Sequence, residues 1–352
     1  MWRKLKDILS TIDAVMITSP HNLRYFSGFA GGEGVCIVGS KFRYLFVDSR
    51  YTIAAKLEVK DFEVIEFAGG KLAEEIFAKL RDNMVKSLGF EDDNLTVAAF
   101  GAYKEKFTGV DFIGISKEMS KLRMVKTEEE LACIRKAEAI GDIAFEKVLP
   151  MLKAGVVECE IAAELEYQMR LCGAEGASFE TIVVSGYKSG MPHGKPGGKK
   201  FEKGDFVTMD FGCVFGGYCS DMTRTVVIEE ASSEHIKIYN TVLKAQLAGL
   251  EAISAGVVCK NADAVARKII TDAGYGKCFG HSLGHGVGLL IHEQPNLSPL
   301  SETVLCENMV VTCEPGIYIE GFGGVRIEDT VVVKEKGLEN LSRSPKELII
   351  CG

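Results

Sequence analysis

Short apolar runs alternate with segments of helical spacing in the first third of the chain. Two segments, 51–57 and 71–85, carry apolar residues three or four positions apart, which predicts helices that bury one face. The dipeptide Ser19-Pro20 predicts a turn after the first strand. Apolar runs with the length of buried strands occupy positions 14–17, 35–38 and 44–47. Strands that alternate with helices predict an α/β unit in which helices cover a mixed sheet.

The pattern changes near residues 122–126, where we place a domain boundary. Thr127 and Glu130 have the spacing of a capping box, and a long helical pattern follows them. A chain of 352 residues has the length of two domains, each large enough for its own core. We therefore expect a smaller domain over residues 1–122 and a larger one over 123–352.

The order of elements after this boundary occurs twice. Helical patterns occupy 127–148, 158–171, 234–254 and 262–273, and apolar strands follow each pair. The sequence Ala-Gly-Val-Val at 154–157 recurs at 255–258, and the His-x-x-Pro that begins at His193 recurs at His292, each about 100 residues later. Two copies of so long a unit predict a duplicated half-domain. A pseudo-two-fold axis would bring matching positions of the two halves together.

Two pairs of acidic residues occupy matching places in these halves, Asp210 with Asp221 and Glu314 with Glu328. Apolar residues flank each pair and glycines lie between its members, which predicts two β-hairpins with an acid on each arm. His285 lies between the two pairs in the sequence. Buried carboxylates are costly unless they are paired or bind metal. Four carboxylates and one imidazole therefore predict a site for two divalent ions such as manganese, cobalt or zinc.

Composition narrows the classes of partner and compartment. Hydrophobic residues make up 47% of the chain and charged residues 26%, as in ordinary globular proteins. The net charge of −8 and the lack of a long basic run argue against nucleic acid or an anionic membrane as a partner. Eleven cysteines without a Cys-x-x-Cys pair favour a reducing compartment. With no apolar run long enough to span a membrane, we expect a cytoplasmic protein.

The acidic pairs and the histidine together resemble the metal ligands of a known enzyme family. Asp210, Asp221, His285, Glu314 and Glu328 are similar to the five ligands of the M24 or pita-bread metallopeptidases, which include methionine aminopeptidase, aminopeptidase P and prolidase. Residues 22–28 and 48–51 resemble the N-terminal domain of the Xaa-Pro branch of that family. The resemblance implies an α+β fold, with a pita-bread domain of pseudo-two-fold halves after a smaller creatinase-like α/β domain.

This resemblance also implies how the ligands are divided between two metal ions. Asp221 and Glu328 are expected to bridge the ions, Asp210 to complete one of them, and His285 and Glu314 to complete the other. Hydroxide that bridges the metals would be the nucleophile, because metal binding lowers the pKa of water by many units. Glu314 would take the proton from that water while it serves as a ligand.

Four further residues receive catalytic roles from the same resemblance. Positions that match His193, His281 and His292 surround the scissile prolyl bond in similar enzymes. His292 is expected to donate a hydrogen bond to the carbonyl as charge develops there. His193 and His281 would shape the proline side of the site or relay protons. Arg326 would orient the site through Asp210 or the substrate carboxylate, and an exposed ion pair is the alternative.

The leading hypothesis is an exopeptidase that removes an N-terminal residue from peptides with proline at the second position. Aminopeptidase P, which accepts longer peptides, and prolidase (Xaa-Pro dipeptidase), which accepts only dipeptides, both fit. The difference depends on loops that close the site beyond the proline, and the sequence does not separate the two. A general or methionine-type aminopeptidase of the same fold is an alternative, and so is a metal-free relative such as creatinase. From another class, a non-catalytic pita-bread domain would bind proteins. The resemblance further implies a homodimer, with manganese as the first choice of metal.

Overall fold

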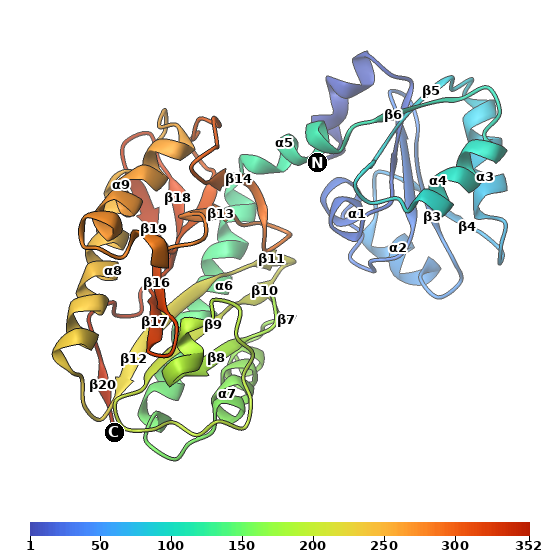
Figure 1. The fold of residues 1–352 in the computed structure, drawn as a ribbon. Coiled ribbons are helices and arrows are strands. Elements are labelled where there is room, and N and C mark those ends of the chain that lie inside the picture. Colours follow the sequence, from blue (N-terminus) through green and yellow to red (C-terminus); the bar gives the residue numbers. More distant parts are fainter. The chain divides into compact units, whose positions relative to one another are not determined.

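The computed structural model describes all 352 residues. It divides the chain into two compact units, Met1–Leu122 and Arg123–Gly352, which the colours from blue to red separate in Figure 1. No helix in either unit is long and apolar enough to cross a membrane. All eleven cysteines are free thiols.

A six-stranded mixed sheet forms the first unit. Its strand order is β4-β3-β2-β1-β5-β6, in which β1 runs antiparallel to β2 and parallel to β5. The strands are β1 (Ala14–Ile17), β2 (Val35–Gly39), β3 (Arg43–Val47), β4 (Glu63–Glu66), β5 (Ser87–Phe90) and β6 (Asp111–Gly114). Its helices are α1 (Pro20–Ser27), α2 (Thr52–Glu58), α3 (Leu72–Asp82) and α4 (Val97–Lys106). The helix α5 (Ser116–Met124) includes the boundary between the two units after Leu122. This arrangement confirms the predicted α/β unit with a mixed sheet.

The turn predicted at Ser19-Pro20 is instead the start of a helix. Ser19 occupies the N-cap position of α1 and Pro20 follows it at the first helical position. Proline is favoured there, because its fixed φ suits the helix and its missing N–H would have no partner in the first turn. Gly28 ends the helix in the left-handed conformation with φ at 83°, which glycine adopts without strain.

Two helix pairs cover the strands of the second unit. α6 (Glu128–Val148) packs on α7 (Glu158–Leu171), and α8 (Ser233–Glu251) packs on α9 (Cys259–Asp272). The capping box predicted for Thr127 and Glu130 is present at the start of α6. In Figure 1, α8 and α9 lie along one edge of the unit and α7 lies along the other, with strands between them.

The strands of the two halves have matching topology. In the first half β9 pairs with β8 and β12, and in the second half β15 pairs with β13 and β18, all antiparallel. These strands are β8 (Ile182–Ser185), β9 (Phe206–Phe211), β12 (Met222–Ile228), β13 (Gly284–Gly286), β15 (Val310–Cys313) and β18 (Asp329–Val333). At the sheet edges lie β14 (Glu293–Leu297), β19 (Leu338–Asn340) and β20 (Ile350–Cys351). The order of elements confirms the duplicated half-domains.

A short hairpin interrupts each acid-bearing pair of strands. In the sequence, β10 (Cys213–Phe215) and β11 (Tyr218–Cys219) lie between β9 and β12, and β10 also pairs with β7 (Gly176–Ala177). Likewise β16 (Gly316–Ile319) and β17 (Gly323–Arg326) lie between β15 and β18. The prediction of one acid on each hairpin arm was therefore wrong in detail. Only Asp210 lies within a strand, whereas Asp221, Glu314 and Glu328 lie one residue outside a strand end.

The backbone explains why two of these acids, Glu314 and Glu328, lie just outside the strands. The pairing of β15 with β18 ends at Cys313 and Asp329. The next N–H groups pair elsewhere, that of Glu314 with the carbonyl of Leu283 and that of Glu328 with the carbonyl of Thr223. The bond from Glu328 to Thr223 joins the two halves, so the acids lie at the junction between them.

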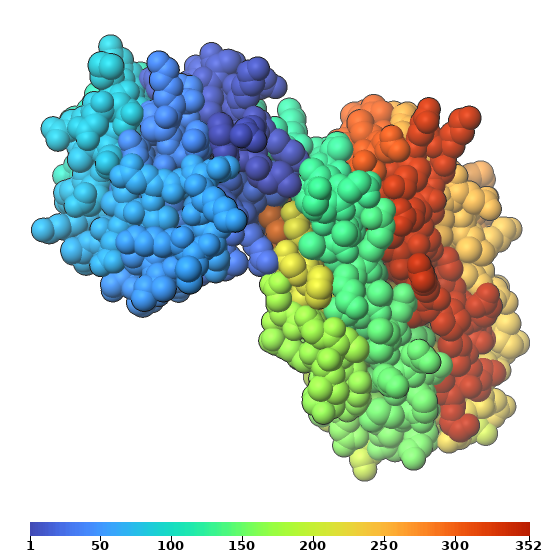
Figure 2. Space-filling view, turned by 180° about the vertical axis from the view of Figure 1, so that it is seen from behind, coloured from blue at the N-terminus to red at the C-terminus, as the bar shows by residue number.

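The C-terminal segment holds the two halves from outside the cavity. Arg224 of β12 is buried and donates to the carbonyls of Glu328 and Ser344 and to the Asp329 carboxylate. The N–H of Ser344 donates in turn to Asp142 of α6. Figure 2 shows the C-terminal residues in red beside α6 in green on the rear face of this unit.

Candidate metal centre

All nine residues singled out in the sequence line one cavity of about 530 Å³. They come from both halves of the second unit, as the predicted pseudo-two-fold axis requires. The residues are His193, Asp210, Asp221, His281, His285, His292, Glu314, Arg326 and Glu328. Most other lining residues are apolar or small, among them Phe179, Ile182, Pro192, Pro196 and Ile291.

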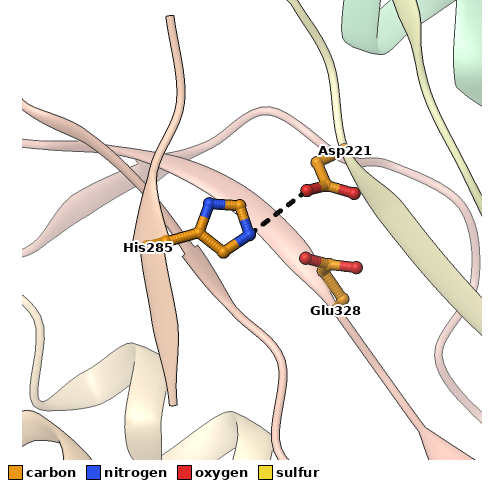
Figure 3. Close-up of side chains that lie close together, drawn as sticks. All are labelled: Asp221, His285 and Glu328. Atoms are coloured by element: carbon orange, nitrogen blue, oxygen red, sulfur yellow. Dashed lines mark ion pairs between the residues drawn. The ribbon is translucent and has the colours of Figure 1, made fainter. Parts of the chain in front are cut away.

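The closest group of ligand atoms belongs to Asp221, His285 and Glu328. One oxygen or nitrogen atom from each lies within 4.8 Å of the others, and Figure 3 shows the three side chains pointing toward one another. His285 Nε2 lies 3.4 Å from Asp221 Oδ2 and 3.3 Å from Glu314 Oε1. Asp210 approaches the group from β9. The structure thus brings all five predicted ligands to one place.

Threonines beside the acids fix their orientation. Thr223 donates its hydroxyl to Glu328 Oε2 at 2.7 Å, and Thr312 donates to Glu314 Oε1 at 3.2 Å. Thr330 occupies the place in β18 that Thr223 has in β12, and its hydroxyl donates to the backbone carbonyl of Asp221 at 2.8 Å. Each half therefore holds an acidic residue of the other half by a threonine.

A glycine allows the strand with His285 to approach the strand before Glu314. A Cβ atom on Gly284 would lie 2.0 Å from the carbonyl oxygen of Thr312, so only glycine fits. The N–H of His285 donates to the Thr312 hydroxyl at 3.1 Å. This close approach places the imidazole against the acids.

Hydrogen bonding fixes the protonation state of His285. Its Nδ1 atom lies 3.1 Å from the carbonyl oxygen of Gly286, which can only accept, so Nδ1 carries the proton. Burial lowers the pKa of His285, which keeps the ring neutral near pH 7. Its Nε2 atom therefore presents a lone pair toward oxygens of Asp221 and Glu314. A lone pair that faces two carboxylate oxygens is repulsive unless a cation or a carboxyl proton lies between them.

The acids themselves repel one another strongly. Burial, followed by the charge of Glu328, raises the pKa of Asp221 well above its usual value. Burial, followed by the charges of Glu314 and Asp210, raises the pKa of Glu328 in the same direction. Burial also raises the pKa of Glu314, to about 7. A site of this kind takes up either protons or cations.

Two buried carboxylate oxygens of the site have no hydrogen-bond donor in the protein. Asp210 Oδ1 and Glu328 Oε1 are buried and have no hydrogen-bond partner in the chain. Unpaired buried carboxylate oxygens are costly, and a divalent cation relieves that cost. Four carboxylates offset the charge of two divalent ions, and the single imidazole completes an oxygen-rich donor set. The residues present therefore fit two divalent ions.

Arg326 is buried beside the acids, which excludes the exposed ion pair considered for it. Its side chain is 5% exposed, and it donates to Asp210 Oδ2 at 2.5 Å. It also donates to the Thr223 hydroxyl at 3.0 Å and to the Tyr318 hydroxyl at 2.8 Å. These contacts favour orientation of Asp210 over recognition of a substrate carboxylate, since each guanidinium nitrogen already donates to a protein acceptor.

Tyr318 is a residue of the site that sequence reasoning missed. Arginine can only donate, so the Tyr318 oxygen accepts from Arg326 and its own hydrogen must be donated elsewhere. His281 Nε2 lies 2.9 Å from that oxygen and His281 Nδ1 lies 2.8 Å from the carbonyl oxygen of Ser282. Nε2 therefore accepts from Tyr318 while Nδ1 donates to Ser282. With both nitrogens engaged, His281 is suited to shape the site and not to relay protons.

The remaining two histidines lie on the cavity wall. The His292 ring meets the His285 ring edge to face, with ring centroids 4.4 Å apart. Burial, followed by the charge of His285, lowers the pKa of His292, so its ring is neutral near pH 7 and has one N–H to donate. His193 lies in the loop between the 3₁₀ turn at Gly186–Gly190 and β9.

Comparison with known proteins agrees with this geometry. Residues 132–335 match Metallopeptidase family M24, and residues 3–125 match the Creatinase/Prolidase N-terminal domain. The chain therefore belongs to the M24 family of metallopeptidases, metal-dependent hydrolases, and its first unit is of the creatinase/prolidase N-terminal type.

Several relatives resemble the chain over almost its whole length. It is 42% identical to the Xaa-Pro dipeptidase of Pyrococcus furiosus, with 97% of this chain and 96% of that protein covered. Comparison with the structure of an Xaa-Pro dipeptidase from Bacillus anthracis gives a TM-score of 0.96 and 44% sequence identity. The match covers 99% of this chain and 98% of that one. The structure of an X-Pro aminopeptidase from Thermotoga maritima has a TM-score of 0.92 and 42% identity, over 99% of both chains.

The raised carboxyl pKa values predict that the metal-free protein loses stability as the pH rises. The pKa of Glu314 is about 7 in the folded protein and about 4.3 in an unfolded chain. The folded state therefore binds more protons, so this contribution is fully present below about pH 4.3 and is lost as the pH rises through about 7. Asp221 and Glu328 act in the same direction. Urea unfolding of chelator-treated protein between about pH 5 and 8 measures the slope of the free energy of unfolding against pH.

The Glu314→Gln variant is the control for this slope. It cannot take up the proton, so its metal-free form should lose less stability over the same pH range. Divalent metal should remove most of the dependence in the wild-type protein, because bound cations replace the protons. Equal slopes for the metal-free wild type and the variant would contradict the assignment.

The hydrogen bonds of His281 predict a single neutral tautomer. Nitrogen NMR of labelled protein at about pH 7 should show a protonated Nδ1 and an unprotonated Nε2, because burial and the Arg326 charge lower the pKa of this ring to about 4. In Tyr318→Phe the Nε2 signal should move, since its donor is lost. An imidazolium signal in the wild type, or an unchanged Nε2 signal in the variant, would contradict this arrangement.

Proposed function

We propose that this protein is a metal-dependent exopeptidase that hydrolyses the bond between an N-terminal residue and a following proline. The observation that carries the proposal is the convergence of four carboxylates and His285 at one cavity whose wall holds three further histidines. The names of the relatives from Pyrococcus furiosus, Bacillus anthracis and Thermotoga maritima support the Xaa-Pro specificity. Both dipeptides and longer peptides fall within the proposal.

The five ligands would hold two divalent ions, with Asp221 and Glu328 shared between them. Asp210 would complete one site, and His285 with Glu314 the other. Bound ions of this kind supply an activated water near neutral pH and polarise the substrate carbonyl. The oxygen-rich donor set favours manganese over a thiolate-binding metal such as structural zinc. The homodimer and the cytoplasmic location stay predictions from the sequence.

Residues of the chain would then transfer the proton of the attacking water and stabilise the negative charge that develops on the substrate carbonyl oxygen. Glu314 would accept a proton from the attacking water and later return it to the leaving group. The Thr312 hydroxyl at Glu314 Oε1 keeps that carboxylate oriented. His292 would donate its N–H to the carbonyl oxygen as negative charge develops there. Arg326 would hold Asp210 in place.

Proline at the second position suits the cavity wall. A prolyl nitrogen has no N–H, so enzymes that grip that N–H cannot use such a substrate. The wall offers apolar contacts from Ile182, Pro192, Pro196 and Ile291, which fit a pyrrolidine ring. His281 is fixed by Tyr318 as a rigid part of the site. We infer that binding depends on the ring and not on a hydrogen at the leaving nitrogen.

Substrate specificity tests the proposal directly. With manganese present, Met-Pro and Ala-Pro substrates should be cleaved at least about tenfold better in kcat/KM than Met-Ala and Ala-Ala, a difference of about 1.4 kcal/mol in transition-state binding. The panel should include Xaa-Pro and Xaa-Pro-Yaa peptides, assayed with added manganese, cobalt or zinc. Acetylation of the substrate N-terminus should block cleavage, because an exopeptidase of this type needs the free amine near Asp210.

The outcomes separate the rival functions. Equal rates on Met-Ala and Met-Pro would indicate a general or methionine-type aminopeptidase. Cleavage of acetylated peptides would remove the exopeptidase assignment. Metal binding without cleavage of any peptide would favour a protein-binding domain of the same fold.

A further inference from the structure

A buried carboxylate outside the cavity lies directly after His292. Glu293 is 6% exposed and begins β14, while His292 ends the loop that enters it. Neither the metal centre nor the proposed chemistry uses this acid. A carboxylate removed from water must be compensated by hydrogen bonds and opposite charge, so its partners indicate what it does.

The Glu293 side chain folds back into the loop between β13 and β14. Its Oε1 atom accepts the N–H of Leu290 at 3.2 Å. A Cβ atom on Gly288 would lie 2.6 Å from its Oε2 atom, so the carboxylate lies against the loop backbone there. This loop has His285 before it on β13 and His292 at its end. One carboxylate therefore braces the turn that separates the two histidines.

Two cations from the start of the second unit hold that carboxylate. Arg123 Nε lies 3.2 Å from Glu293 Oε1, and Lys126 Nζ lies 3.6 Å from Glu293 Oε2. All three side chains are at most 6% exposed. The Lys126 backbone N–H donates to the carbonyl of Asn308, two residues before β15, which fixes the segment that carries the cations. The anchor therefore rests on the same sheet as the loop that it holds.

Loss of one partner from such a cluster has a local consequence. An ion pair removed from water is held in one geometry, and removal of one partner leaves buried charge that the surroundings must accommodate by moving. The Gly286–His292 turn is the element that can move, because β13 and β14 already have irregular pairing between His285 and Gly286. The His292 ring would move with the turn, while Thr312 still holds the backbone of His285.

We propose that Glu293, clamped by Arg123 and Lys126, is a positioning residue that sets the place of His292 at the substrate carbonyl. It acts through the loop and touches neither substrate nor metal. The proposal rests on the proposed function for the role of His292 in turnover. The placement of the His292 ring by Glu293 can be tested without that role.

The Glu293→Gln variant keeps the size of the side chain and an acceptor for Leu290 but removes the charge that the two cations face. With metal bound, kcat for a Met-Pro substrate should fall by up to about 100-fold while KM changes little, as expected for a misplaced catalytic group. In a His292→Ala background the same substitution should leave kcat unchanged, because its target is gone. If Glu293→Gln lowered kcat by the same factor in the wild-type and His292→Ala backgrounds, the proposal would be overturned. A wild-type kcat in Glu293→Gln would also overturn it.

Two further variants keep the test decisive. If Glu293→Gln does not fold, Lys126→Met removes one clamp and leaves the carboxylate with Arg123, and it should show the same dependence on His292. Glu91→Gln is the matched control, because Glu91 is a buried carboxylate of the first unit that accepts from the N–H of Ser19. It should lower stability and leave kcat at the wild-type value. A loss of kcat in this control equal to that in Glu293→Gln would overturn the proposal.

Failure of the proposed function is distinguished by a structural readout. If the wild-type protein cleaves no Xaa-Pro peptide, that function fails while the inference about Glu293 is still tested by crystal structures of the wild type and of Glu293→Gln. The His292 ring, whose centroid lies 4.4 Å from that of His285, should be displaced in the variant. An unmoved ring would overturn the inference.

Discussion

Repulsion among buried carboxylates at the junction of two half-domains is the constraint on which the rest of this structure depends. Asp221 and Glu328 come from different halves, yet their ligand atoms lie within 4.8 Å of each other and of His285. Such a group is unfavourable in the low dielectric of a protein interior unless cations or protons neutralise it. Metal binding and the joining of the halves are therefore coupled. Any substitution that weakens metal binding should also destabilise the junction between the two half-domains.

The surrounding protein holds the cavity histidines by a common device. These histidines are His193, His281 and His292. A buried acid that lies outside the cavity fixes the segment that carries each of them. Glu158 of α7 accepts the N–H groups of Ser185 and Gly197, which flank the first histidine loop. Asp263 of α9 accepts the N–H of Leu283 beside the second. The second helix of each half thus supplies the acid for His193 and His281, whereas the acid beside His292 is Glu293 of β14. Rigidity of this kind is what precise placement of catalytic groups requires.

Much of the fold and the cluster of ligands could be predicted because their signals are local or repeated. The 158–171 helix was predicted with its observed bounds, since apolar spacing and flanking breaks mark both ends. Matching acids in two halves indicated, without knowledge of the strand geometry, the residues that line one cavity in the structure. The β5 and β6 strands were missed, because each is only four residues long and contains a glycine. Short runs of this kind carry little periodicity.

Contacts between distant parts of the chain could not be predicted from these patterns. Tyr318 looks like an ordinary apolar strand residue, and its role appears only when the strand places its hydroxyl between Arg326 and His281. The partners of Glu293 lie as far as 170 positions away in the sequence. The division of each predicted hairpin into outer strands and an inserted short hairpin likewise depends on contacts with other segments, such as the pairing of β10 with β7. Pattern analysis therefore found the groups that would bind metal better than the groups that orient them.

Metal content and position test the central claim most directly. Anomalous diffraction from manganese-soaked crystals of the wild-type protein should show two ions per chain, both beside Asp221 and Glu328. Asp221→Ala removes a shared ligand, and the same experiment on this variant should show both sites depleted. Two fully occupied sites in Asp221→Ala, or ions bound away from these five ligands in the wild type, would contradict the account.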